Sequence, residues 1–170
     1  MQHIRALITV AALAALFPAP ASAMDPCLVG TWEPEGNGAA EWVQRQAPGM
    51  KMAVSRQAAS LHLGADGRYR LHAQVQAAGE RDGIRARSDG RFAAQGGWRS
   101  ADGSLTLTPS SSDTDATTEL SGKGGRVSLK TPRGDTRPTT QQYRCRGSEL
   151  ETRMQIPGVT DPIIQRYRRQ

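Results

Sequence analysis

The sequence is poor in the residue types that most enzymes depend on. It contains three histidines and two cysteines in 170 residues, and aromatic residues make up 5% of the chain. No serine, cysteine or histidine stands in a recognisable nucleophile motif. Asp66, Asp102, Asp113 and Asp115 lie among turn-forming or Ser/Thr-rich residues, where solvent exposure explains them. The sequence therefore indicates a protein that is not an enzyme and needs no cofactor.

Metal and nucleic-acid binding also lack their usual signatures. His62 and His72 fall on solvent-facing positions of predicted strands, without a third ligand nearby. Basic residues outnumber acidic ones, 22 to 16. The two signs are mixed along the chain, and no aromatic residues are interleaved with basic patches. We expect arginine-rich solvated faces, no metal and no nucleic-acid partner.

No hydrophobic run is long enough to cross a membrane. The apolar run Ala6–Phe17 ends at two prolines, and Ala21-Ser22-Ala23 has the small-residue spacing that a signal peptidase reads. We therefore predict a signal peptide over residues 1–23, a mature single domain over 24–170, and a periplasmic or secreted location. Met24-Asp25-Pro26 is not a lipobox, so we expect no stable membrane anchor.

The two cysteines, Cys27 and Cys145, both lie in the predicted mature part. In an oxidising compartment such an isolated pair most simply forms one disulfide. Free thiols and half of a metal site are the alternatives, and two cysteines without nearby histidines make a poor metal site.

Alternating apolar and polar residues, separated by turn signals, predict short strands along most of the mature chain. The first strand, Leu28–Glu33, directs Trp32 inward. Predicted turns at Gly64–Gly67, Asp102-Gly103 and Arg146-Gly147 set the register of three later hairpins. The predicted cross-strand pairs are Leu63 with Tyr69, Leu61 with Leu71, Trp98 with Leu107, Ser100 with Leu105, Tyr143 with Leu150, and Arg144 with Glu149.

A few segments depart from the strand pattern. Asn37 stands at an N-cap position, and Ala39, Trp42 and Val43 recur at helical spacing, which predicts an amphipathic helix over 38–46. We expect this helix to lie against one mouth of the strands. Residues 79–90 are charged and rich in glycine, which fits a long loop or a ragged strand end. Residues 109–118 are rich in Ser, Thr and Asp, which predicts a loop. The glycine pair before Trp98 predicts a bulge.

Four features in chain order carry a resemblance to a known family: Leu28–Trp32, Asp66–Tyr69, the Gly97–Leu107 hairpin, and the Tyr143–Leu150 hairpin followed by the aromatic last strand. In these features the chain resembles the bacterial lipocalin-like proteins of the calycin type. The resemblance implies an up-and-down antiparallel barrel, in which Gly30 and Trp32 are structural and Trp32 plugs the closed end. It also implies a basic side chain of a late strand beside that indole, with Arg166 or Arg168 as the candidate.

The leading functional hypothesis is a non-enzymatic binding protein. A small hydrophobic molecule would enter the barrel mouth near Trp42, Tyr69, Trp98 and Tyr143, although core packing is the alternative role for aromatic residues. A small barrel can also be filled by its own side chains and bind nothing. The second hypothesis is a protein–protein inhibitor or immunity-type factor that acts through exposed loops, such as 123–126 or 133–137.

The mass of the intact exported protein tests the export hypothesis. We expect a mass that lacks residues 1–23 and two further hydrogens, because the signal peptide is removed and the two thiols are oxidised. A full-length mass, or two thiols that react with iodoacetamide, would contradict the predicted compartment.

Overall fold

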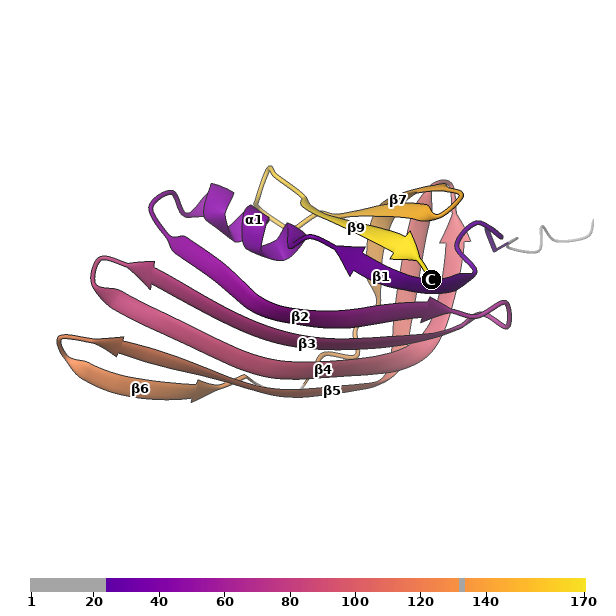
Figure 1. Ribbon diagram of the computed structural model, residues 1–170. Coiled ribbons are helices and arrows are strands. Elements are labelled where there is room, and N and C mark those ends of the chain that lie inside the picture. The colour runs from indigo at the N-terminus through magenta and orange to yellow at the C-terminus, as the bar shows by residue number, and fades with distance from the viewer. Residues whose placement is uncertain (1–23, 132–133) are drawn as a thin grey trace, which may run out of the picture.

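The strands of the chain form one antiparallel sheet that closes into a barrel (Figure 1). The computed structural model describes residues 24–131 and 134–170, with the backbone alone at 55–57. The barrel has eight strands and one short helix, which confirms the predicted all-β class. The predicted signal peptide, 1–23, lies outside the described residues. The elements are β1 (Gly30–Glu35), α1 (Gly38–Gln46), β2 (Lys51–Leu63), β3 (Arg68–Arg81), β4 (Ile84–Ala101), β5 (Ser104–Gly122), β6 (Gly125–Lys130), β7 (Thr139–Arg146), β8 (Glu149–Met154) and β9 (Ile163–Arg169).

The strands differ greatly in length, and this sets the shape of the molecule. Strands β2 to β5 are 13 to 19 residues long, whereas β1, β7, β8 and β9 have 6 to 8 residues. Only one end of each long strand takes part in closing the barrel. Strand β5, for example, pairs with β7 through Ser104–Leu107 alone. The other ends run on beyond the barrel, to the left in Figure 1, where β6 joins β5. We call this part, residues 51–58, 74–81, 84–91, 114–122 and 125–130, the sheet extension.

The barrel interior holds a core of buried side chains. Trp32, Leu28 and Leu105 are completely buried. The indole N–H of Trp32 donates to the Leu28 carbonyl at 2.8 Å, and that of Trp98 donates to the Gly64 carbonyl at 2.9 Å. Both indoles therefore bury their apolar rings without leaving a donor unpaired. The remaining core side chains are Leu61, Leu63, Tyr69, Ala94, Leu107 and Leu150.

The cation beside Trp32 is Arg169, which corrects the expectation of Arg166 or Arg168. Trp32 is the direct cross-strand partner of Arg169, and its guanidinium carbon lies 4.3 Å from the indole centroid. Arg166 and Arg168 occupy the alternate positions of β9, so they point outward, to Glu151 and Glu35. The period of two along a strand explains the difference, since only every second side chain can reach the interior.

Arg169 also fixes the backbone around the closed end of the barrel. Its guanidinium donates to the carbonyl of Val29 and, at 2.6 Å, to that of Cys27. Gly30 has a positive φ of 147°, and a Cβ there would lie 2.8 Å from Arg169 Nη1. Glycine at position 30 therefore gives the guanidinium room to reach both carbonyls.

The disulfide between Cys27 and Cys145 ties the turn before β1 to strand β7. Their Cα atoms are 6.0 Å apart, and the bond spans a sequence separation of 118 residues. In the chain-entropy description, closing a loop of this length stabilises the fold by about 4–5 kcal/mol. The structure confirms the predicted pairing.

Two predicted hairpin registers are confirmed, and one is wrong. Strand pairing matches Leu63 with Tyr69 and Trp98 with Leu107, as the turn chemistry requires. In the β7–β8 hairpin the turn is Gly147-Ser148, so Leu150 pairs with Cys145 and not with Tyr143. This register sets two arginines opposite two glutamates, which is favourable across strands. Because the shift is two residues, Cys145 still faces the core, as predicted.

The loop predicted at 109–118 is also wrong, because this segment is strand. Residues 79–90 form neither a long loop nor a ragged strand end, because β3 and β4 run up to a tight turn at Asp82-Gly83. Asp82 and Gly83 have φ values of 54° and 76°, the same left-handed pair as at the predicted turn Asp102-Gly103. Such a two-residue turn suits a tight hairpin, and β3 and β4 pair without interruption up to it. The polar segment 109–118 is sheet because β4 pairs along its whole length.

The bulge predicted by the glycine pair before Trp98 is present. The β4–β5 register shifts between Gln95 and Gly96, and Pro109 is the cross-strand partner of Gly96. A Cβ on Gly96 would lie 2.1 Å from the Thr108 carbonyl oxygen, so the strands approach too closely for any side chain there. The bulge also accommodates a proline inside a long strand.

The predicted helix is confirmed, with the bounds Gly38–Gln46. Asn37 precedes it, although its side chain makes no capping hydrogen bond. Trp42 donates its indole N–H to the Asp161 carbonyl at 2.8 Å, and Gln44 donates its amide to the Met52 carbonyl at 3.1 Å. These bonds hold α1 between the segment before β9 and the β2 edge of the sheet extension.

Replacement of Trp32 by alanine tests the closed end of the barrel. We expect Trp32→Ala to lower the free energy of unfolding by about 3–5 kcal/mol, because it leaves a large cavity and removes the ring beneath Arg169. Urea unfolding followed by circular dichroism measures the loss. Trp42→Ala is the matched control and should cost clearly less, since Trp42 is only half-buried on α1. Equal losses in the two variants would contradict this account.

Candidate functional site

The four aromatic residues predicted to line the barrel mouth do not form one site. Tyr69 and Trp98 are 2% and 5% exposed, and Tyr143 packs against the same core. The Tyr143 hydroxyl donates to Asp25 at 2.9 Å, and burial, followed by this bond to Asp25, raises the pKa of the phenol. Trp42 lies apart from the other three, on α1. Three of the four residues therefore belong to the core or pack against it.

Exposed apolar side chains gather instead on the sheet extension. Among the described residues, the large hydrophobic side chains that remain exposed are Val75, Ile84, Val127 and Leu129, at 37%, 55%, 55% and 50%. Strand pairing places all four on the face that continues the barrel interior. Scattered exposed apolar residues are common on proteins, but four on one face mark a candidate binding surface.

This face, which we call the concave face, contains an apolar groove of about 310 Å³. The volume is at the lower end of the range for small-molecule sites. Two methionines, Met50 and Met52, contribute flexible side chains that adapt to different shapes. The remaining lining residues come from the tips of β3 and β4 and from β5: Ala77, Ala78, Gly79, Glu80, Arg81, Asp82, Ile84, Ala86, Ser88 and Leu120.

The groove arises from the same alternation that fills the barrel. Leu71 and Phe92 pack against the core, and the positions that follow them at intervals of two are Ala73, Val75 and Gly90. Farther along, Ala77 and Ala86 continue these rows into the groove. Among the described strands, no shorter one covers these rows, because the barrel closes before this point.

The opposite face of the sheet extension is polar and is held by cross-strand contacts. Gln76 donates to Asp89 at 2.7 Å, and Arg91 lies 3.5 Å from Asp115. These pairs are solvated, so each adds little to stability. The sheet extension therefore has one polar face and, opposite it, the concave face with the exposed apolar side chains.

Basic residues surround the tip of the groove. Arg81 lines the groove and pairs with Asp82 at 3.3 Å, and Arg85 pairs with Glu80 at 3.6 Å. Lys51 begins β2 at the same end, and Lys123 lies in the β5–β6 turn, so cations outnumber carboxylates at the tip. An anionic group would be favoured here by the local charge.

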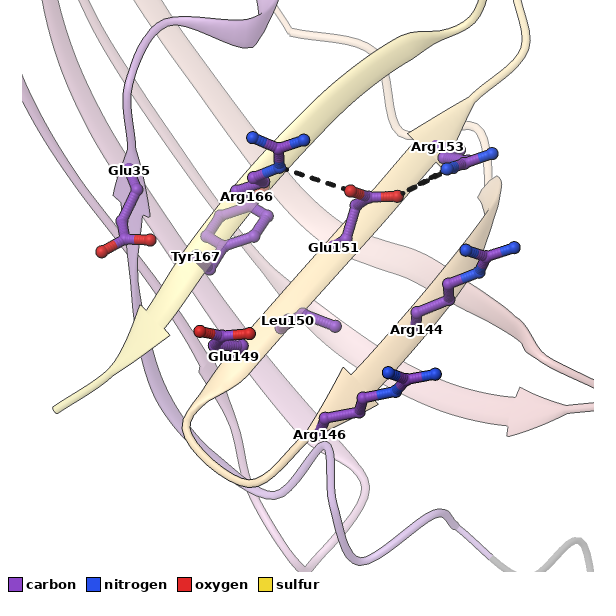
Figure 2. A pocket seen from close by; sticks show the side chains of 9 residues that line it. All are labelled: Glu35, Arg144, Arg146, Glu149, Leu150, Glu151, Arg153, Arg166 and Tyr167. Atoms are coloured by element: carbon purple, nitrogen blue, oxygen red, sulfur yellow. Dashed lines mark hydrogen bonds and ion pairs between the residues drawn. The ribbon is translucent and has the colours of Figure 1, made fainter.

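A second, polar pocket of about 480 Å³ lies on the outside of the barrel, over β7, β8 and β9 (Figure 2). Glu151 is at its centre, 2.8 Å from Arg153 and 3.4 Å from Arg166. Figure 2 shows Arg144 and Arg146 beside it, along β7. The hydrogen bond from Arg153 is the main cause that holds the pKa of Glu151 below its usual value, and Arg166 acts in the same direction. Acidic and basic strands alternate here, so this surface is a ladder of solvated ion pairs that connects neighbouring strands.

The described residues contain no group of three or more histidine, cysteine, aspartate or glutamate side chains that could hold a metal ion. His62 lies on the outer surface of the barrel, with Nδ1 3.0 Å from the Thr31 hydroxyl. His72 is the cross-strand partner of Ser60 on the same surface. Within the described part of the chain, no helix combines the length and hydropathy of a membrane crossing.

Of the loops proposed for a protein partner, 123–126 forms the turn and first residues of the β5–β6 hairpin. In the segment 133–137, Arg133 lies outside the described residues, and Arg137 is bound to Asp135 through its backbone N–H at 2.9 Å. That bond is the largest cause that lowers the pKa of the exposed Asp135 carboxyl. Of the described residues in these two segments, only those of 123–126 include part of a strand, β6.

Comparisons with protein-family models, with curated proteins and with solved structures find no match to this chain. The closed antiparallel barrel is consistent with the architecture that the lipocalin resemblance implies.

Sequence reasoning missed the groove because it did not recognise 79–90 as a tight hairpin and assigned 109–118 to a loop. The signal was present, since Asp82-Gly83 is the same dipeptide as the recognised turn Asp102-Gly103. The alternation of Ile84 and Ala86 with arginines follows directly after it. Small residues make this alternation weak, because alanine and glycine carry little hydropathy contrast.

The pKa of Glu151 predicts how the ladder responds to acid. The ion pairs lower this pKa in the folded protein, so their contribution to stability is complete above the unfolded value and is lost as the pH falls through the folded value. We expect the Arg153→Met variant to raise the pKa of Glu151, measured by carboxyl carbon NMR, and to weaken the loss of stability in acid. An unchanged titration of Glu151 would contradict this assignment.

Proposed function

We propose that this protein is an exported, non-enzymatic binding protein with a lipocalin-like barrel, which holds a hydrophobic ligand in the groove of the concave face. One observation carries the proposal: the exposed large apolar side chains of the described chain all lie on the face that contains the groove. Binding a ligand there would remove their apolar surface from water, at about 25 cal/mol per Å².

The filled barrel interior favours a ligand site outside the barrel. Tyr69 and Trp98, predicted for the mouth, are core side chains with 5% exposure or less. A ligand in the barrel would have to displace them, whereas the groove is open already. The lipocalin-like barrel then acts as the rigid support of a binding sheet.

The charge around the groove favours an amphiphile with an anionic head. The apolar chain would lie along Met52, Ala77 and Ala86, and its head would reach the basic tip near Arg81 and Lys123. Cations near the head would add a salt-dependent contribution to affinity. The ligand class we propose is therefore a fatty acid or another single-chain anionic lipid.

The disulfide supports the exported location. Disulfides persist in oxidising compartments and are rare in the cytosol. The bond between Cys27 and Cys145 closes most of the mature domain, so a reduced form would lose a large part of its stability.

Titration with 11-(dansylamino)undecanoic acid tests the proposal. We expect an increase in dansyl fluorescence with saturable binding, and an affinity at least about tenfold lower for Ile84→Glu, because this change puts a carboxylate in the apolar groove. Ile84 is 55% exposed, so the variant should keep its fold.

Ser128→Glu is the matched control, since it adds the same charge to an exposed position on the polar face of β6. It should bind the probe as the natural sequence does. Equal loss in both variants, or no saturable binding by the natural sequence, would contradict the groove as a ligand site. A dansyl probe with an amine in place of the carboxylate should bind more weakly, and stronger binding would contradict the anionic head.

A further inference from the structure

The sheet extension ends in a strand with an open edge. Strand β6 is last in the sheet order, pairs only with β5, and is exposed along its whole length. Within the described residues, no element covers its other side. Figure 1 shows β6 at the border of the extension, away from the barrel.

The backbone groups that face this edge can be assigned from the ladder. The Thr131 N–H donates to the Ala116 carbonyl at 3.0 Å, and Leu129 and Val127 are in register with Thr118 and Leu120. In an antiparallel ladder, alternate residues bond to the same neighbour. Val127 and Leu129 therefore bond to β5, and the N–H and C=O groups of the residues between them point to the free edge.

The other edge of the extension, β2, has a helix beside its first residues, which makes the β6 edge distinctive. Helix α1 packs beside β2, and Gln44 donates its side-chain amide to the Met52 carbonyl at 3.1 Å. Covering an edge in this way prevents pairing with another chain. Strand β6 has no such cover and presents the groups that a further strand needs.

The side chains of β6 define the chemistry of that further strand. Arg126 and Lys130 lie on the polar face, and neither makes an ion pair with another described residue. Val127 and Leu129 lie between them on the concave face, 55% and 50% exposed. A residue directly opposite in a sheet has its side chain on the same face, so opposite charges and apolar pairs are favoured.

We propose that the β6 edge binds an extended segment of a partner protein by strand addition. The segment carries acidic residues at positions one and five, opposite Arg126 and Lys130, and apolar residues at positions two and four, beside Val127 and Leu129. The pattern reads the same in both directions, so it holds for parallel and antiparallel addition. Main-chain bonds give affinity, and the side-chain pattern gives specificity.

A second copy of this chain does not fit the same edge. Antiparallel pairing of two β6 strands over their whole length would set Arg126 opposite Lys130 of the other copy, twice. Like charges directly opposite each other are destabilising in a sheet. These cations thus disfavour self-association and favour an acidic partner.

A pair of labelled peptides tests the proposal. The acidic peptide is Thr-Glu-Val-Thr-Val-Glu-Thr, and the control peptide has lysine in place of both glutamates. Fluorescence anisotropy at low and at physiological salt should show at least about tenfold tighter binding of the acidic peptide to the natural sequence. The variant with Arg126→Glu and Lys130→Glu should reverse this preference. Equal binding of both peptides, or an unchanged preference in the double variant, would overturn the proposal.

The backbone contribution is tested at Ser128. Its N–H points to the free edge, so Ser128→Pro removes a donor that the fold does not use, as edge strands tolerate. We expect this variant to melt as the natural sequence does and to lose binding of the acidic peptide, while Ser128→Ala keeps it. Retained binding by a folded Ser128→Pro variant would exclude strand addition. Sedimentation equilibrium should show a monomer, and a dimer dissociated by Ser128→Pro would assign the edge to a second copy instead.

Discussion

Side-chain alternation along the long strands is the constraint on which the rest of this structure depends. Because successive side chains point to opposite faces, a strand that leaves the barrel carries its interior row with it. Strands β3, β4 and β5 run well past the point of closure, so the rows that contain Leu71 and Phe92 continue into open solvent. The barrel core and the concave face thus share the same side-chain rows, in which Ser88 and Thr118 are hydrogen-bonded hydroxyls among apolar residues. The strands close around the barrel core and leave the concave face exposed.

The barrel end of this surface is closed by Arg169. Its guanidinium covers the Trp32 ring and binds backbone carbonyls of the turn that contains Cys27. The disulfide to Cys145 fixes the same turn to β7. A cation stacked on a buried indole and bound to carbonyls satisfies its donors without a carboxylate. The stacked cation, the buried indole and the disulfide therefore hold the closed end together.

The sheet extension carries both proposed interactions, on different groups. The groove presents side-chain surface to an amphiphile, whereas the β6 edge presents backbone donors and acceptors to a protein strand. Val127 and Leu129 lie between the two, on the concave face and on the edge strand. An added strand would widen the concave face by one row, since its apolar side chains would lie beside these residues. The two activities are separable, because Ile84 lines the groove and Ser128 belongs to the edge.

The sequence by itself determined the all-β class, the helix at 38–46, the cysteine pair and the hairpin registers that depend on local turn chemistry. The registers are encoded within a few residues, as at the turns Gly64–Gly67 and Asp102-Gly103. The disulfide follows because the sequence contains only two cysteines. Only the tertiary structure decided which arginine meets Trp32, because the register between β1 and β9 joins distant segments without a turn between them. It also decided that the polar segment 109–118 is a strand, since pairing with β4 outweighs its weak apolar pattern. The local signal for the concave face was weak for a related reason, because alanine, glycine and serine make a surface only when neighbouring strands place them side by side.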